Sequence, residues 1–196
     1  MSYTNLFTPN IIIRNGIPLM FILCLFSGFS TPQNKWKTEQ LDKANTARDI
    51  AGMTLMEKEA IQYINLARLY PKQFISIELK DYTQALDHTP NYYQGSRYKA
   101  SLINELEKMT PLEALIIEES LNESARCFSN EIGVSGRRGH ERVTCPKLTT
   151  AECISYGMYN GKDIAMQLLI DHNVPNLGHR KICLDKGYRK TGISVH

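Results

Sequence analysis

The sequence has little net charge and lacks several patterns that indicate a particular chemistry. Its 196 residues carry a formal net charge of only +3, and no basic stripe is visible, which argues against nucleic acid as a partner. No Cys-x-x-Cys pair occurs, so a zinc ribbon or a thioredoxin-type redox site has no support. The Gly-x-Ser-x-Gly and His-Glu-x-x-His motifs are absent as well. No catalytic nucleophile therefore stands out.

Long apolar runs are also scarce, and the one at the N-terminus is short. The run from 17 to 29 follows Arg14 and falls short of the roughly 20 residues needed to cross a bilayer. It predicts a signal peptide, residues 1–30, cleaved after Ser30. An uncleaved N-terminal anchor is the alternative, and a lipoprotein acylated at Cys24 is a weaker one. We expect an exported protein, secreted, periplasmic or at the cell surface, without a membrane span after cleavage.

The remaining chain has the length of one domain. Residues 31–53 are polar and show no apolar periodicity, so we interpret them as a linker. Residues 54–196 fit a single domain, since domains typically have about 100 to 200 residues.

Few cysteines remain once the predicted signal peptide is removed. They are Cys127, Cys145, Cys153 and Cys183. An exported protein permits disulfides, and four cysteines allow three connectivities. Cys145 and Cys153 bracket a short loop and are the easiest pair to join, but the sequence does not choose among the three.

Apolar spacing and capping residues predict several helices. Thr54 and Glu57 form a capping box before a helix over 55–70, which Pro71 ends. A second box at Thr110 precedes an apolar stripe over 114–132, which predicts one long helix, or a turn and a helix, facing the core. Shorter patterns predict helices near 74–79, over 101–109 and over 160–171 with Asn160 as the cap, and a strand over 189–195.

Two histidines and two carboxylates form the best candidate site. His140 and His179 each follow a glycine, which we expect to allow a close approach of the backbone. Glu152 lies between them in the sequence. Asp171 is placed at the C-terminal end of the predicted helix over 160–171, where its charge opposes the helix dipole, and this favours a paired role.

These four residues suit more than one chemistry. Imidazole nitrogens and carboxylate oxygens can hold zinc, with His140 and His179 as tentative ligands. A neighbouring carboxylate can also raise the pKa of a histidine and orient its tautomer. The four side chains can therefore bind a metal, exchange protons with a ligand, or hydrogen-bond each other and hold loops together.

Several short motifs occur in the order seen in the CAP superfamily, which the region from Thr54 to the end resembles. This superfamily comprises cysteine-rich secretory, venom-antigen and pathogenesis-related proteins with an SCP-like domain, and the bacterial-type branch is the most similar. The motifs are Asn65-Leu-Ala-Arg68, Ser124-Ala125 to Glu131-Ile132, Gly139-His140, Ala151-Glu152-Cys153-Ile154, Gly178-His179-Arg180 to Leu184, and Thr191-Gly192-Ile193. Their order is more specific than any single motif.

The resemblance implies an α+β fold, an α/β/α sandwich with helices on both sides of a small antiparallel sheet. It also implies a cleft lined by the tetrad His140, Glu152, Asp171 and His179. The chain departs from the family at Cys153, where asparagine is usual, at Ala151, where glycine is usual, and at Leu168, where many members have tryptophan. The family usually continues beyond the position of His196 into a final strand, so either the sheet is smaller here or the chain is truncated.

Three functions remain open from the sequence. As the resemblance implies, the chain is expected to be a binding module that holds a lipid, glycan, peptide or extracellular partner protein in the cleft and its grooves. The alternative is a zinc-dependent hydrolase in which Glu152 or Asp171 acts as a base for a metal-bound water. A structural surface domain is the third possibility.

Overall fold

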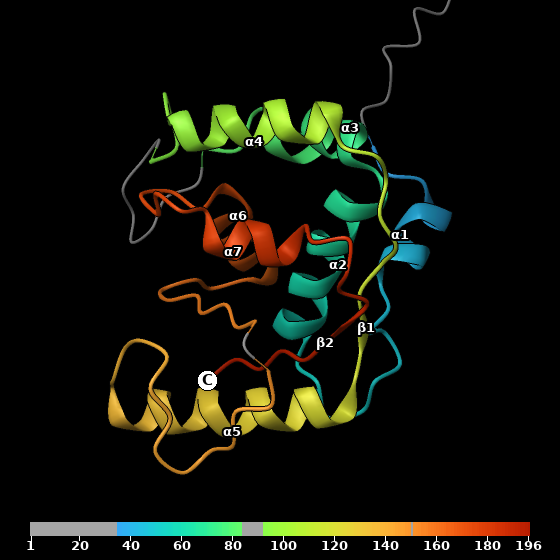
Figure 1. The fold of residues 1–196 in the computed structure, drawn as a ribbon. Coiled ribbons are helices and arrows are strands. Elements are labelled where there is room, and N and C mark those ends of the chain that lie inside the picture. Colours follow the sequence, from blue (N-terminus) through green and yellow to red (C-terminus); the bar gives the residue numbers. More distant parts are fainter. Residues whose placement is uncertain (1–34, 84–91, 150) are drawn as a thin grey trace, which may run out of the picture. The chain divides into compact units, whose positions relative to one another are not determined.

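The computed structural model describes residues 35–83, 92–149 and 151–196. In these ranges the chain is rich in helix and has one small two-stranded sheet (Figure 1), so the α+β class is confirmed in this coarse form. The elements are α1 (Thr38–Ala44), α2 (Leu55–Leu69), α3 (Pro71–Phe74), the π-helix η1 (Ile75–Leu79), α4 (Arg97–Lys108), β1 (Ile116–Ile117), α5 (Glu119–Ser135), α6 (Gly161–Ile170), α7 (Gly178–Cys183) and β2 (Lys190–Thr191). The predicted signal peptide and Cys24 lie outside the described residues.

The centre of the fold is the pair α2 and α6, and both helices begin where the sequence predicts. Thr54 Oγ1 accepts a hydrogen bond from the backbone N–H of Glu57, and the Glu57 carboxylate accepts one from Thr54 N–H, which completes the capping box. Asn160 Oδ1 accepts from the N–H of Asp163 at 2.8 Å and caps α6. Helix α2 packs against α6 and α1, while α6 also contacts α7 and α4.

The segment interpreted as a linker is partly helical. Helix α1 lies within it and packs on α2, and Ala44 and Ala47 are fully buried. Asn65 of α2 explains this order, because its side-chain amide donates to Ala44 O at 3.0 Å. Asn65 therefore holds a segment that is distant in sequence and that shows no apolar periodicity of its own.

The sheet is parallel, and the prediction of an antiparallel sheet was wrong. Ile116 pairs with Lys190 and Ile117 with Thr191. The connection between the two strands contains α5, α6 and α7, and a long crossover returns the chain in the same direction. The predicted strand over 189–195 shortens to two residues because the next amides donate to side chains: Ile193 N–H to Asn122 Oδ1 and Val195 N–H to Glu57 Oε1.

The helix predicted to follow the capping box at Thr110 begins later, at Glu119. Before it the chain is extended, because its amides donate to α2 rather than to a helical turn. Leu112 N–H donates to Arg68 O at 2.8 Å, and Leu115 N–H donates to Asn65 Oδ1 at 2.7 Å. The box at Thr110 was therefore a wrong prediction, whereas Gly136 does end α5, with the left-handed φ of 65°.

Arg68 and Arg180 are fully buried and connect the helices that carry the candidate site. Arg68 of α2 donates to the carbonyl oxygens of residues 113, 183, 185 and 188. Arg180 of α7 donates to Leu169 O, Ile170 O and Tyr98 O at 2.7 to 2.8 Å. These contacts hold α7, and the loop that follows it, against α2, α4 and α6.

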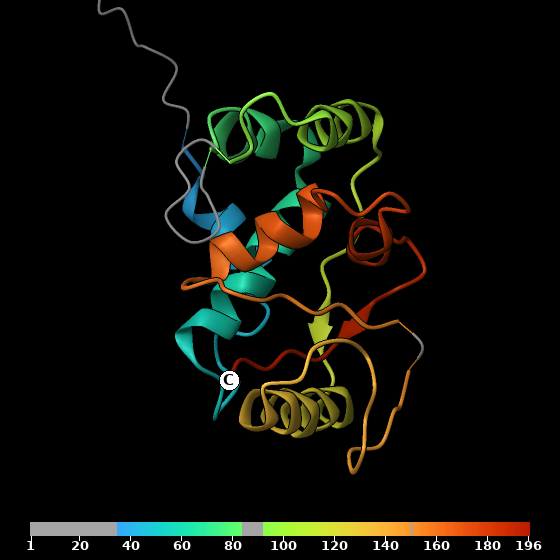
Figure 2. The same cartoon turned by 90° about the vertical axis from the view of Figure 1, so that its left-hand side faces the viewer.

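Helix α5 stands apart from the other helices. In both views it runs along one side of the domain, and the C-terminal segment after β2 lies between α5 and α2 (Figures 1 and 2). Ser129 of α5 donates to Ser194 of this segment at 2.8 Å. Within the described ranges no helix is both long enough and apolar enough to cross a membrane.

Candidate functional site

The four predicted site residues form two hydrogen-bonded pairs. His140 Nδ1 lies 2.9 Å from Glu152 Oε1, and His179 Nδ1 lies 2.8 Å from Asp171 Oδ1. An ionised carboxylate only accepts hydrogen bonds, so each Nδ1 carries the proton that it donates. Nε2 is then the acceptor nitrogen of the neutral ring. The two pairs differ in burial. The side chains of His179 and Asp171 are 25% and 1% exposed, whereas those of His140 and Glu152 are 49% and 12% exposed.

Asp171 is placed by the junction between α6 and α7. It caps the C-terminus of α6 in the left-handed conformation, with φ 55°. Its Oδ2 accepts from the backbone N–H of His179 at 3.0 Å and of Arg180 at 3.2 Å, at the start of α7. The Asp171 carboxylate lies at the negative end of the α6 dipole, which is unfavourable, but it also lies at the positive end of α7. The second interaction explains why an aspartate is tolerated at this position.

Glu152 is held by Arg142, which the sequence analysis did not single out. The Arg142 guanidinium donates to Glu152 through Nη2 and Nε and lies over the Phe128 ring at 4.1 Å. Burial pushes the pKa of the Glu152 carboxyl upward, but hydrogen bonds from Arg142 and His140 outweigh it and hold that pKa below its ordinary value. Glu152 is therefore ionised at neutral pH and accepts hydrogen bonds from both Arg142 and His140.

The loop that carries His140 is fastened to α5. Glu131 of α5 accepts from the backbone N–H groups of Val143 and Thr144 at 2.8 Å and of Cys145 at 3.1 Å, and from Arg137 Nη2 at 2.6 Å. The hydrogen bond from Thr144 N–H is the largest of the effects that lower the pKa of Glu131 to about 2.

A disulfide joins the same loop to α5. Cys127 is bonded to Cys145, while Cys153 and Cys183 are free thiols. Of the three connectivities, the structure contains the Cys127–Cys145 bond, and the pairing of Cys145 with Cys153 that seemed easiest from the sequence is wrong. Spacing along the chain favoured the shorter loop, but the long helix α5 places Cys127 beside Cys145.

We expect the contribution of Glu131 to stability to depend on pH. Its pKa is about 2 in the folded protein and 4.5 ordinarily, so its contribution is complete above about pH 4.5 and is lost as the pH falls through about 2. Urea unfolding between pH 7 and pH 2 should therefore show a smaller loss of stability on acidification in Glu131→Gln than in the wild type. Glu123→Gln, an exposed position of the same helix, should follow the wild type. Equal acid sensitivity of Glu131→Gln and the wild type would contradict this role.

The glycines beside the two histidines do not serve a close approach of the backbone, contrary to the prediction. A Cβ atom added to Gly178 would meet only the Asn176 side chain, at 3.5 Å, and one added to Gly139 would meet no atom of the described chain within 4 Å. Gly139 has a φ of 101°, which a residue with a Cβ rarely adopts, and this is the physical reason for a glycine there.

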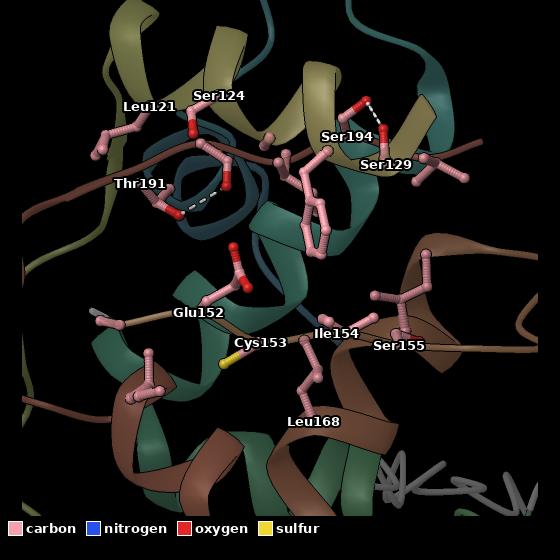
Figure 3. Close-up of a pocket in the computed structure, with 18 of the residues that line it drawn as sticks. Leu121, Ser124, Ser129, Glu152, Cys153, Ile154, Ser155, Leu168, Thr191 and Ser194 are labelled. Atoms are coloured by element: carbon pink, nitrogen blue, oxygen red, sulfur yellow. Dashed lines mark hydrogen bonds between the residues drawn. The ribbon is translucent and has the colours of Figure 1, made fainter. Parts of the chain in front are cut away.

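A cavity of about 770 Å³ lies between α5 and the central helices. Leu121 and Ser124 of α5 lie on one side and Leu168 of α6 on the other, with Glu152 between them (Figure 3). Further apolar lining comes from Ile61, Ile64, Ala125, Phe128, Ile132, Ile154, Ile193 and Val195. The stripe on α5 that predicted a core-facing helix thus borders an open space. Of the tetrad only Glu152 lines it.

Cationic side chains surround this mainly apolar cavity. Arg137, Arg142, Arg189 and Lys190 line it, and each pairs with a glutamate. Arg138 also lines it, is exposed, and lies over the Tyr156 ring at 5.4 Å. No acidic partner of Arg138 is found in the described part of the chain. Arg137 and Arg138 are neighbours in a loop, and the fold brings both to this apolar cavity.

His172, next to Asp171, is a histidine that the sequence analysis did not consider. It packs among the rings of Tyr92, Tyr93 and Tyr98, and its Nδ1 lies 2.8 Å from Ser96 Oγ. Burial lowers its pKa. The three tyrosines therefore pack around a histidine that lies just beyond the C-terminal end of α6.

Neither the fold of the described residues nor the donor set forms a metal centre. Across residues 35–83, 92–149 and 151–196, no three histidine, cysteine, aspartate or glutamate side chains are grouped so that they could hold a metal ion. Catalytic zinc takes three protein ligands, and here each histidine is bonded to one carboxylate. The role of His140 and His179 as zinc ligands stays a prediction.

Comparison with known proteins places the chain in no family. No family model matches it, and neither a curated protein nor a solved structure matches it. The candidate function therefore rests on the chain's own geometry.

Proposed function

We propose that this chain is an exported CAP-type binding module that holds an anionic amphiphile, such as a fatty acid, in the cavity beside α5. The observation that carries the proposal is a space of about 770 Å³ with apolar side chains from three parts of the fold and arginines around it. Ligand sites in proteins are typically apolar concavities of about 300 to 1,000 Å³ with a few placed polar groups. A lipid tail fits this lining better than a glycan.

The charge of the lining selects the head group. Four of the five cationic side chains already have a glutamate partner, whereas Arg138 pairs only with the face of Tyr156 within the described residues. A carboxylate or phosphate on the ligand would provide the acceptor that Arg138 lacks. The apolar tail would then lie along Leu121, Ala125 and Phe128.

Membership in the CAP superfamily and export are part of the same proposal. The motif residues His140, Glu152, Asp171 and His179, which are far apart in the sequence, form hydrogen-bonded pairs, as expected if the motifs build one site. The Cys127–Cys145 disulfide supports an oxidising compartment. The His140–Glu152 pair serves here to hold the cavity wall, with Glu152 and its partner Arg142 lining the cavity.

Binding of palmitate should be saturable and should weaken when the cavity is filled. We expect Ala125→Phe to weaken binding at least about tenfold, or 1.4 kcal/mol, because the new ring occupies the space of the tail. Ala100→Phe, at an exposed position of α4, is the matched control and should bind as the wild type does. The measurement is isothermal titration of the purified protein with palmitate. Unchanged affinity of Ala125→Phe would refute the cavity as the site.

A second pair of titrations tests the head group and separates the binding module from a tetrad-dependent function. Arg138→Gln should weaken palmitate binding about threefold, the size of an exposed charge contact, and leave binding of hexadecanol unchanged. Arg126→Gln, on the exposed surface of α5, is the control. His179 does not line the cavity, so His179→Ala should retain palmitate binding. Loss of binding in His179→Ala would instead place the ligand at the tetrad.

A further inference from the structure

The two free cysteines, Cys153 and Cys183, are neighbours in the fold and their thiols interact. The Cys153 thiol donates to His179 O at 3.8 Å. Cys183 is one helical turn after His179 on the same short helix, α7, so its side chain lies on the same side as that carbonyl. Both cysteines line the cavity, and Cys153 packs against the core cluster that contains Cys183.

The surroundings of Cys153 connect both halves of the tetrad. Cys153 directly follows Glu152, and its thiol contacts the backbone of His179. A hydrogen bond between the thiols of Cys153 and Cys183, together with burial, raises the pKa of Cys153. Cys183 is 5% exposed, whereas Cys153 is only partly buried and is open to the cavity.

We propose that Cys153 and Cys183 form a second, intramolecular disulfide by thiol–disulfide exchange, and that this bond locks the Glu152 segment onto α7. The Cys153 thiolate attacks one sulfur of a small disulfide, RSSR, and forms a mixed disulfide as one RS⁻ leaves. The Cys183 thiolate then attacks Cys153 Sγ, and the second RS⁻ leaves. In total two thiols and RSSR give one protein disulfide and two RSH, so the oxidant is the small disulfide.

The locked form holds the two histidine–carboxylate pairs in a fixed relation. Without the bond, the Glu152 segment contacts α7 through the Cys153 thiol and packing. With the bond, Glu152 directly precedes one end of the covalent bridge, and His179 lies one helical turn before the other end.

The test is oxidation of the full chain with oxidised glutathione, followed by alkylation of remaining thiols and a non-reducing peptide map. We expect a crosslinked peptide that contains Cys153 and Cys183, alongside an intact Cys127–Cys145 bond. In Cys183→Ser the expected product is a stable glutathione adduct on Cys153, and in Cys153→Ser both adduct and crosslink should be absent. The map assigns each cysteine, so a reaction of Cys24 does not disturb the result.

Two outcomes overturn the proposal. One is that both Cys153 and Cys183 in the wild type are still alkylated after oxidation, and the other is a crosslink of either to Cys127 or Cys145. A second measurement uses only the wild type and so does not need the variants to fold. The oxidised protein should unfold at a higher urea concentration than a sample in which the Cys153–Cys183 bond has been mildly reduced and both thiols alkylated. An equal midpoint would show that no stabilising bridge forms.

Discussion

Arg68→Met is expected to lower the free energy of unfolding by about 4 kcal/mol, since it leaves several buried carbonyl oxygens without a donor. The Arg68 side chain is fully buried and donates to four carbonyl oxygens, of Glu113, Cys183, Asp185 and Tyr188, at 2.7 to 3.0 Å. Methionine fills a similar volume but supplies no donor. The loss of stability should also affect the position of His179, because the same hydrogen bonds hold the end of α7.

The control variants separate the hydrogen bonds from charge and volume. Arg126→Met makes the same change on the exposed surface of α5 and should alter stability by less than about 0.5 kcal/mol. Arg68→Lys keeps the charge but replaces a planar fork by a single ammonium group, so it should recover only part of the loss. Urea unfolding followed by circular dichroism measures all three. If Arg68→Lys equals the wild type, the fork geometry has no role.

Gly192→Ala is expected to cost about 2 to 3 kcal/mol of stability, at the upper end of the range for overpacking. A Cβ atom at this position would lie 2.2 Å from the backbone C of Leu121 and 2.3 Å from the backbone N of Asn122. Those atoms belong to α5, and a helix backbone cannot yield as a flexible side chain can. The segment after β2 must therefore move away from α5, which widens the cavity.

The matched control is Gly178→Ala, in the motif that contains His179. Its Cβ would make only an ordinary contact with Asn176, at 3.5 Å, and alanine is a better helix former than glycine at the start of α7. We expect stability equal to or slightly above that of the wild type. Thermal unfolding of both variants, with palmitate titration as a second readout, gives the comparison. A Gly192→Ala protein as stable as Gly178→Ala would contradict the close packing of this segment on α5.

The pairing of Asp171 could be predicted from the sequence, whereas the disulfide connectivity could not, and both outcomes have physical reasons. The pairing of Asp171 was predicted correctly, because a carboxylate at the C-terminal end of a helix is unfavourable unless another group compensates it, and here the start of α7 does. The disulfide was predicted only as one of three connectivities. Its partner choice depends on how α5 lies against the loop from 137 to 145, and spacing along the chain contains no such information.

The arginines show most clearly what the sequence does not reveal. Arg68, Arg142 and Arg180 are charged residues that composition alone would place at the surface, yet their guanidinium groups hold the core and the site together. Carbonyl oxygens at chain turns attract them, and which carbonyls gather in one place is known only once the chain has folded. Arg68 and Arg180 occur within the motifs, but the sequence indicated no role for either side chain.

The sequence alone predicted the helices α2 and α6 with their caps, and it named the four residues that form the two histidine–carboxylate pairs without saying which would pair. These features depend on interactions within a few residues, or on motifs that are recognised as strings. Four features could be seen only in the folded chain: the parallel pairing of β1 with β2, the Cys127–Cys145 bond, the contact of Cys153 with α7 and the cavity beside α5. Each of these depends on where elements distant in sequence come to lie, because packing and side-chain hydrogen bonds between them override the local pattern.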